Sequence, residues 1–391
     1  MKSGTLRKPA EFVEEGFASA DRLGELERIA SRYATALPLA LADLIDKSDP
    51  HDPIARQFVP DAAELEVLAN ESADPIGDDT HSPIAGIVHR YPDRVLLKLV
   101  QVCAVYCRFC FRREMVGPGK PNALSAAAVN AALDYIRSHE EIWEVILTGG
   151  DPLVLSPRRL RSVMRQLATI DHVKIVRIHT RMPIADPGRL SADMVRAMSS
   201  KAQAVYVAVH VNHARELTAL ARAACARIVD AGIPMLSQSV LLAGVNDTPE
   251  ALGALMRALV ECRIKPYYLH HGDLAPGTSH LRTNIESGRA LMRALHGRLS
   301  GLCQPTYVLD IPGGYGKSPI GPCYLEPARD GAKGVYDVQD FNARRHRYPP
   351  EPSRPVGRNS VPDGNQIEQR GGHRETRKAD EDDCDDGVPD E

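Results

Sequence analysis

The sequence predicts an α/β protein centred on a partial (β/α)6 barrel, with a helical N-terminal extension and a disordered C-terminal tail. Two observations support this prediction. Six β-rich apolar runs alternate with helical segments between residues 94 and 310, which is typical of parallel strands joined by helices. Polar or cysteine residues follow several of these runs, at the edge where (β/α) barrels place their chemistry. An open doubly wound sheet is the alternative.

The first 85 residues are expected to form a helical extension that wraps the barrel. Residues 11–31 and 33–45 carry apolar side chains at helical spacing. The stretch from Pro50 to Pro83 is rich in Asp and Pro and has no sustained period. Such composition favours irregular backbone on the surface of the domain that follows.

The barrel is expected to occupy residues 86–325. Its strands are predicted at 94–102, 143–147, 173–178, 204–209, 235–240 and 265–269, and its helices at 125–138, 157–168, 213–231 and 248–261. Val, Ile and Leu are nearly continuous in most of these strands, which indicates a sheet that is covered on both faces.

The remaining segment, residues 326–391, loses this pattern. From about Arg344 the composition turns to Pro, Gly, Arg, Gln and acidic residues, which predicts disorder from about residue 344. Residues 380–391 include eight Asp or Glu and no Lys or Arg. This acidic end is interpreted as a solvating tail, with an interaction peptide as the alternative.

Composition excludes several classes of protein. The net charge is −3 and the Lys and Arg residues are dispersed, so nucleic-acid binding is not expected. No run of eighteen apolar residues and no N-terminal apolar stretch is present, which predicts a cytoplasmic protein without a membrane segment. Eight cysteines in 391 residues do not make a disulfide framework.

Three of these cysteines lie together. Cys103, Cys107 and Cys110 form C-x3-C-x2-C directly after the first barrel strand, and closely spaced thiolates suit a zinc ion or an iron–sulfur cluster. The other five cysteines are scattered singly, so a fourth thiolate would have to come from a distant residue. A [4Fe–4S] cluster with one open iron is the simpler interpretation. Zinc with a remote fourth ligand and ordinary buried thiols remain as alternatives.

This cysteine spacing resembles that of the radical S-adenosylmethionine enzymes. Four further stretches narrow the resemblance: H-R-Y-P-D-R at 89–94, H-V-N-H at 210–213, P-Y-Y-L-H-H-G-D at 266–273 and P-T-Y-V-L-D-I-P-G-G-Y-G-K at 305–317. Together they resemble the lysine 2,3-aminomutase family over roughly residues 30–325. The resemblance implies a barrel of the radical SAM type and three cofactors: a [4Fe–4S] cluster, S-adenosyl-L-methionine and pyridoxal 5'-phosphate.

The same resemblance implies an isomerase that converts L-lysine to β-lysine. A 5'-deoxyadenosyl radical and a pyridoxal phosphate imine would move the α-amino group to C3. Lys317 would carry pyridoxal phosphate as a Schiff base; a nucleotide-binding P-loop does not fit, because Ile311 stands where its first glycine is needed. A surface loop lysine is the other interpretation. By resemblance, Arg90 and Arg94 line the pyridoxal phosphate site.

Further residues are assigned by resemblance alone. Gly149, Gly150 and Asp151 would hold the amino group of S-adenosylmethionine, with His210 and Gln238 nearby. Arg112 would clamp the substrate α-carboxylate. Asp273 and Asp310 would hold the ε-ammonium of lysine, although Asp310 could instead cap the turn before Pro312.

The resemblance leaves several points open. The long clostridial relatives carry extra cysteines for a structural zinc, one of them at the place of Thr248, so no structural zinc is predicted and a homo-oligomer is only an option. A reducing electron donor such as flavodoxin or ferredoxin is expected. Enzymes that modify one lysine of elongation factor P share the cysteine motif and are the closest alternative. A metal-binding scaffold protein is the alternative from another class.

Overall fold

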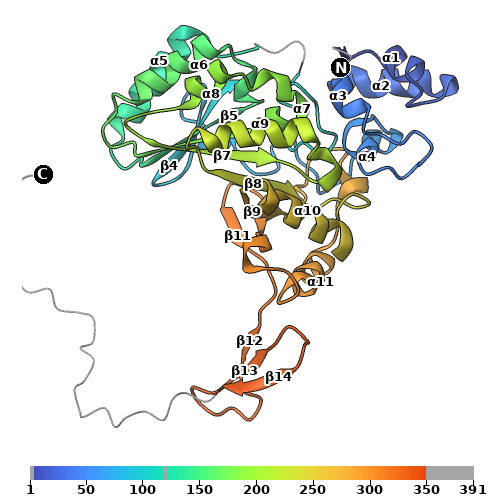
Figure 1. The fold of residues 1–391 in the computed structure, drawn as a ribbon, viewed down its shortest axis with the longest axis vertical. Coiled ribbons are helices and arrows are strands. Elements are labelled where there is room, and N and C mark those ends of the chain that lie inside the picture. Colours follow the sequence, from blue (N-terminus) through green and yellow to red (C-terminus); the bar gives the residue numbers. More distant parts are fainter. Residues whose placement is uncertain (1–3, 118–121, 349–391) are drawn as a thin grey trace, which may run out of the picture.

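A nine-stranded sheet forms the centre of the part of the chain described by the computed structural model, residues 4–117 and 122–348 (Figure 1). Its strands follow the order β11-β10-β9-β8-β7-β6-β5-β4-β3. Seven neighbouring strands are parallel: β4 (Arg94–Val100), β5 (Glu144–Gly149), β6 (Ile175–Thr180), β7 (Ala204–His210), β8 (Met235–Val240), β9 (Ile264–His270) and β10 (Thr306–Ile311). The six predicted strands are confirmed, and so is the partial barrel.

An antiparallel strand lies at each edge of this sheet. β3 (Ile87–Tyr91) pairs with β4, and β11 (Gly316–Pro319) pairs with β10. No backbone ladder joins β3 to β11 in the described chain. Instead, the backbone N–H of Lys317 donates a hydrogen bond of 2.7 Å to Oη of Tyr91. The sheet therefore curls until its two edges meet through a side chain.

Two glycines allow the edges to come this close. Gly77 and Gly314 both have positive φ, at +69° and +89°, and a Cβ built at Gly77 would lie 2.4 Å from N of Gly314. Any larger residue at position 77 would push the loop that precedes Lys317 away from the N-terminal extension.

The helices that cover the sheet are α5 (Ala126–Ser138), α6 (Pro157–Leu167), α7 (Met182–Ala185), α8 (Ala192–Met198), α9 (Ala219–Asp230), α10 (Pro249–Glu261) and α11 (Ile285–Leu295). The N-cap residues of the six longest, all but α7, are Ser, Thr or Asn, whose side chains accept a hydrogen bond from a backbone N–H of the first turn. α7, α8 and α11 were not predicted.

The N-terminal extension contains shorter helices than predicted: α1 (Pro9–Glu14), α2 (Leu23–Arg32), α3 (Leu39–Ala42) and α4 (Ala55–Phe58), together with the paired strands β1 (Thr5–Leu6) and β2 (Leu37–Pro38). It packs on the loop that carries the cysteines. Tyr106 N donates to Ala36 O at 3.0 Å, and Arg108 N donates to Gln57 O at 2.8 Å. Apolar side chains of the extension and of the barrel belong to one core.

A three-stranded antiparallel sheet follows the barrel: β12 (Leu325–Pro327), β13 (Tyr336–Gln339) and β14 (Arg345–Tyr348). It projects away from the body (Figure 1). The predicted onset of disorder near Arg344 is wrong for residues 345–348, which pair along β13 and form ion pairs from Arg345 to Glu326 and from Arg347 to Asp330. The rest of the predicted tail, with its acidic end, lies outside the described residues.

No helix among the described residues is long and apolar enough to cross a lipid bilayer.

Candidate functional site

One cavity of about 500 Å³ lies inside the curled sheet and brings together every residue that the sequence assigned to a site. These residues are Arg90, Arg94, Cys103, Cys107, Cys110, Arg112, Gly149, Gly150, Asp151, His210, Gln238, Asp273, Asp310 and Lys317. Strand geometry explains the convergence, because alternate residues of a strand face the same side. On β5, Glu144, Ile146 and Thr148 line the cavity, and on β6, Arg177 and His179 do so.

The three clustered cysteines lie at the carboxyl end of β4 as free thiols. Burial raises the pKa of all three thiols, and that of Cys107 to about 11. A cation is therefore needed to keep them as thiolates. Within the described residues, no three His, Cys, Asp or Glu side chains converge on a single ion. A four-iron cluster takes one thiolate per iron, so three thiols that face one cavity fit it without meeting at a point.

Buried ion pairs fix this loop against the N-terminal extension. Glu64, whose side chain has no exposed surface, pairs with both Arg108 and Arg113. Burial raises the pKa of Glu64, but the charge and the hydrogen bonds of Arg108 outweigh it, and the pKa lies below its usual value. Arg113 Nη1 also donates to Gly277 O at 3.0 Å. The cysteine loop is thus anchored at residues on both sides of Cys110.

The Gly149-Gly150-Asp151 stretch packs directly behind the first cysteine. Gly149 has φ +118°, and a Cβ there would lie 2.2 Å from the carbonyl oxygen of Val100, so glycine is required. Gly150 N donates to that oxygen at 2.7 Å. The Asp151 carboxylate accepts hydrogen bonds from Thr180 Oγ1 and from Arg181 N, each at 2.7 Å. It therefore holds the end of β6.

Lys317, which lines the cavity from β11, forms an ion pair. Its Nζ donates to Asp310 Oδ1 at 2.6 Å, and Asp310 and Lys317 are register partners on β10 and β11. His270 Nδ1 lies 3.4 Å from the second oxygen of Asp310. Burial raises the pKa of Asp310, but the hydrogen bond from His270 and the charge of Lys317 outweigh it and bring it below its usual value.

Two buried hydrogen-bond acceptors of this region have no partner among the described residues: Asp273 Oδ1 and His270 Nε2. Burial, and then the charge of Asp310, raise the pKa of Asp273 to about 7. Burial lowers the pKa of His270. A neutral His270 that donates from Nδ1 to Asp310 has its Nε2 lone pair free. Both residues line the cavity, and both atoms are hydrogen-bond acceptors without donors.

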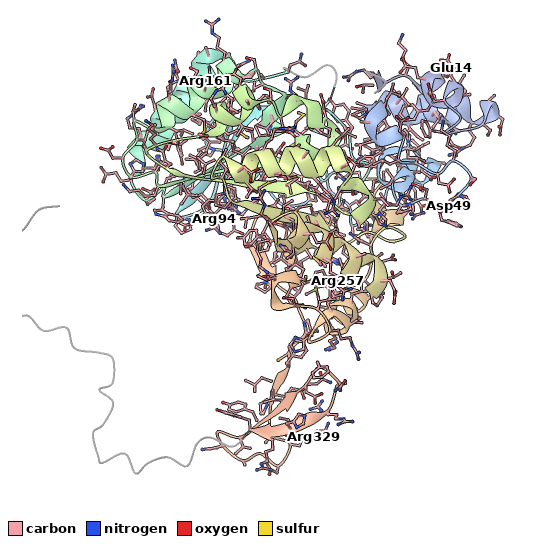
Figure 2. The ribbon with its side chains drawn as sticks, in the orientation of Figure 1. Glu14, Asp49, Arg94, Arg161, Arg257 and Arg329 are labelled. Carbon is pink, nitrogen blue, oxygen red and sulfur yellow. The ribbon has the colours of Figure 1, made fainter. Side chains whose placement is uncertain are left out.

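The three cavity arginines that the sequence assigned to the site, Arg90, Arg94 and Arg112, are held by neighbouring groups. Asp78, which is only 1% exposed, accepts hydrogen bonds from Arg90 Nη2 at 2.9 Å and from Arg112 Nη2 at 2.8 Å. Arg94 stacks on the ring of Tyr91 at 3.8 Å and lies at the edge of the body in Figure 2. The guanidinium groups are therefore fixed in place, as binding an anion requires.

His210 and Gln238 lie side by side on β7 and β8, as register partners. Burial, and then the charge of Arg181, lower the pKa of His210 to about 3, so it is neutral. Gln238 Nε2 lies 3.3 Å from Nε2 of His179, which the sequence placed at a strand end without a role.

Several residues of the site were given no role from the sequence: the cavity residues Tyr91, Glu144, Arg177, His179, Arg181, Tyr267, Tyr268 and His270, and Asp78, which holds two cavity arginines. The sequence placed His179 and Arg181 only at the carboxyl end of the strand predicted at 173–178, where the chemistry was expected. A signal existed for some of them. Arg177 stands within the apolar run V-K-I-V-R-I, and a charge there requires a partner inside the barrel. Its Nη2 donates to Glu144 Oε2 at 3.0 Å.

The chain is similar to known proteins over most of its length. Residues 97–256 match the Radical SAM superfamily. The chain is 39% identical to an L-lysine 2,3-aminomutase of Clostridium subterminale, over 82% of this chain and 77% of that protein. It is 35% identical to an L-lysine 2,3-aminomutase of Escherichia coli, over 74% of this chain and 83% of that protein.

A relative with another substrate in its name is similar to nearly the same degree. A glutamate 2,3-aminomutase of Clostridioides difficile is 36% identical, over 77% of this chain and 70% of that protein. The cavity that gathers the cysteines, the lysine and the arginines agrees with these matches. The chain belongs to the lysine 2,3-aminomutase family of radical SAM proteins and is an enzyme of the isomerase class.

Proposed function

We propose that the protein is an L-lysine 2,3-aminomutase, which moves the α-amino group of L-lysine to C3 and gives β-lysine. The main support is the end of the cavity that carries Lys317, Asp310, Asp273 and His270, called the lysine end below. Lys317 pairs with Asp310, and beside them Asp273 Oδ1 has no partner among the described residues. When bound, the cluster with S-adenosylmethionine supplies a carbon-centred radical, and pyridoxal phosphate supplies the carbonyl to which the migrating nitrogen attaches.

The chain's own residues divide into four groups by task. Cys103, Cys107 and Cys110 would hold three irons, and a donor such as flavodoxin or ferredoxin would supply the electron. The backbone at Gly149 and Gly150, with Asp151, His210 and Gln238, would face S-adenosylmethionine. Arg90 and Arg94 would meet the phosphate of pyridoxal phosphate. Arg112, held by Asp78, would bind the substrate α-carboxylate.

The Lys317–Asp310 pair suggests how one carboxylate can serve two ammonium groups. Lys317 would have to lose a proton to the solvent before its Nζ could bind the carbonyl carbon of pyridoxal phosphate, and it would then leave Asp310 ionised. Asp310 is free at that moment to accept the ε-ammonium of lysine. Burying that ammonium without a partner would cost several kcal/mol, and the cavity offers Asp310, Asp273 Oδ1 and His270 Nε2 as acceptors for its three N–H groups.

The same acceptors argue against the substrate of the glutamate relative. A glutamate side chain would bring a third carboxylate beside Asp273 and Asp310, and like charges at close range in a buried site repel strongly. The metal-binding scaffold considered from the sequence does not agree with membership of an isomerase family. A lysine of elongation factor P is still an alternative substrate.

The test is covalent trapping together with turnover. Anaerobically reconstituted protein, treated with pyridoxal phosphate and borohydride, should carry the pyridoxyl adduct on Lys317 when analysed by peptide mass spectrometry. Lys317→Ala should lose the adduct and at least about a thousandfold in turnover, whereas Lys201→Ala, an exposed lysine, should keep both. Product analysis with free L-lysine and with elongation factor P identifies the substrate. An adduct on another residue, or turnover by Lys317→Ala, contradicts the proposal.

A further inference from the structure

We propose that Arg181 is a positioning residue for the cluster, which donates a hydrogen bond to the sulfur of Cys107 and raises the reduction potential of the cluster. Its Nη1 lies 3.4 Å from Cys107 Sγ. Among the described hydrogen bonds, this is the one in which a guanidinium reaches any of the three clustered cysteines. The inference rests on the proposed cluster and does not depend on the substrate.

The guanidinium is held by groups from three separate parts of the chain. Arg181 directly follows β6 and is 6% exposed. Its Nη2 donates to Oε1 of Gln57 on α4, at 3.0 Å, and to the carboxylate of Glu216, which follows β7. The guanidinium carbon also lies 4.8 Å from the ring centre of Phe58 and 5.6 Å from that of Phe109. Arg181 can therefore move little from its place beside Cys107.

The carboxylate partner is itself fixed. Glu216 Oε1 accepts hydrogen bonds from the backbone N–H groups of Asn212 and His213, at 2.9 and 2.8 Å, and from Gln57 Nε2 at 3.2 Å. Its side chain has no exposed surface. A buried guanidinium needs such a partner, and the pair leaves a polarised N–H directed at sulfur. The negative charge of Glu216 therefore partly compensates the positive charge that Arg181 places beside the cluster.

The expected effect follows from charge. A cluster gains negative charge when it is reduced, so a cationic donor at a ligand sulfur stabilises the reduced form more than the oxidised form. Replacing Arg181 by Gln should lower the midpoint potential. Replacing Glu216 by Gln should raise it, because the charge of Arg181 is then less compensated. We expect about a tenfold change in the reduction equilibrium, or about 59 mV for a one-electron couple.

The opposite signs separate this role from a merely structural one. A structural defect would disturb the site in the same way in both variants, whereas the electrostatic role moves the potential in opposite directions. Arg177→Gln is the matched control, because Arg177 is a buried arginine of β6 with a glutamate partner, Glu144. It precedes Arg181 by four residues, about 13 Å along a strand, and has no contact with a thiol among the described hydrogen bonds.

The experiment is a redox titration followed by the paramagnetic signal of the reduced cluster. Iron and sulfide are first counted in the parent protein; fewer than four of each would contradict the cluster itself, and the variants are compared only in protein that holds it. A lower potential in Arg181→Gln and a higher one in Glu216→Gln, with Arg177→Gln unchanged, supports the inference. An unchanged potential in Arg181→Gln, or shifts of the same sign, overturns it. If Arg181→Gln binds no cluster, the sign in Glu216→Gln decides in the same way.

Discussion

Around the cysteine loop, Arg108, Arg113 and Arg181 each pair with a carboxylate, whereas at the lysine end Asp273 Oδ1 and His270 Nε2 have no hydrogen-bond partner among the described residues. The charges of the first region are paired without a ligand, although Arg113 Nε and Arg181 Nε donate to no group among the described residues. Its ion pairs reach from the barrel into the N-terminal extension. In the second region the Asp310 carboxylate already pairs with the Lys317 ammonium, and the two acceptors have no donor.

This difference shows which part of the site the protein builds and which part the ligand completes. Buried charges that are paired in advance fix geometry at a cost in desolvation that the fold must offset. Unpaired buried acceptors are costly until a donor arrives, so they select for ligands that bring one. The cysteine end should therefore respond to mutation chiefly in stability and in cluster properties, and the lysine end in substrate affinity.

The largest effect is expected from Glu64→Gln at the cysteine end. Removing the carboxylate leaves Arg108 and Arg113 buried without a counter-charge, which should cost about 3–5 kcal/mol of the free energy of unfolding. Denaturant unfolding of the metal-free protein measures it. Glu326→Gln, in the exposed pair with Arg345, is the control and should leave stability unchanged. If Glu64→Gln is as stable as the control, the anchoring role of Glu64 is wrong.

The next effect is expected at the lysine end, from Asp310→Asn. Loss of one buried charge partner costs about 2–5 kcal/mol of binding free energy. Since about 1.4 kcal/mol corresponds to a factor of ten, KM for lysine should rise about 30-fold or more. Binding of S-adenosylmethionine should stay unchanged, because Asp310 lies with Lys317 and not with the cysteines. Norleucine, which lacks the ε-ammonium, should inhibit the parent and the variant equally. An unchanged KM for lysine would show that Asp310 does not select the substrate.

The smallest effect concerns pH. Burial raises the pKa of Asp273 to about 7 in the ligand-free protein, and an ammonium binds the ionised form. The kcat/KM for lysine should therefore fall as the pH drops below 7, by up to about tenfold per unit. Asp310 titrates below its usual range and so stays ionised over this window. In Asp273→Asn the step near pH 7 should disappear. If the parent and the variant show the same step, a group other than Asp273 titrates there.

The parts of the molecule that the sequence could predict are those with local signals. The three cysteines stand within eight residues, and the six strand runs differ clearly in composition from the helices between them. The N-caps at Ser125, Ser156 and Thr248 agree with the helix starts that periodicity indicates, whereas α9 begins after Thr218, later than the predicted start at residue 213. These features can be recognised without knowing which distant residues contact them in the folded protein.

The rest depends on partners that are distant in the chain. Arg181 meets Gln57 across 124 positions, and neither residue carries a motif that announces the contact. Asp78 stands in a stretch that its Asp and Pro content assigned to irregular surface, yet it is buried because two arginines converge on it. The strands β13 and β14 have four residues each, which is too few for a strand pattern to be recognised, so their pairing reveals them.

The contact between Tyr91 and Lys317 has a consequence for the order of events during synthesis. These residues are 226 positions apart and join the first strand of the sheet to the last. Because a ribosome makes the chain from its N-terminus, the cysteine loop emerges long before the strand that encloses it. The thiols are therefore made before the strand that encloses them, and the order of synthesis allows cluster insertion to precede enclosure of the cavity.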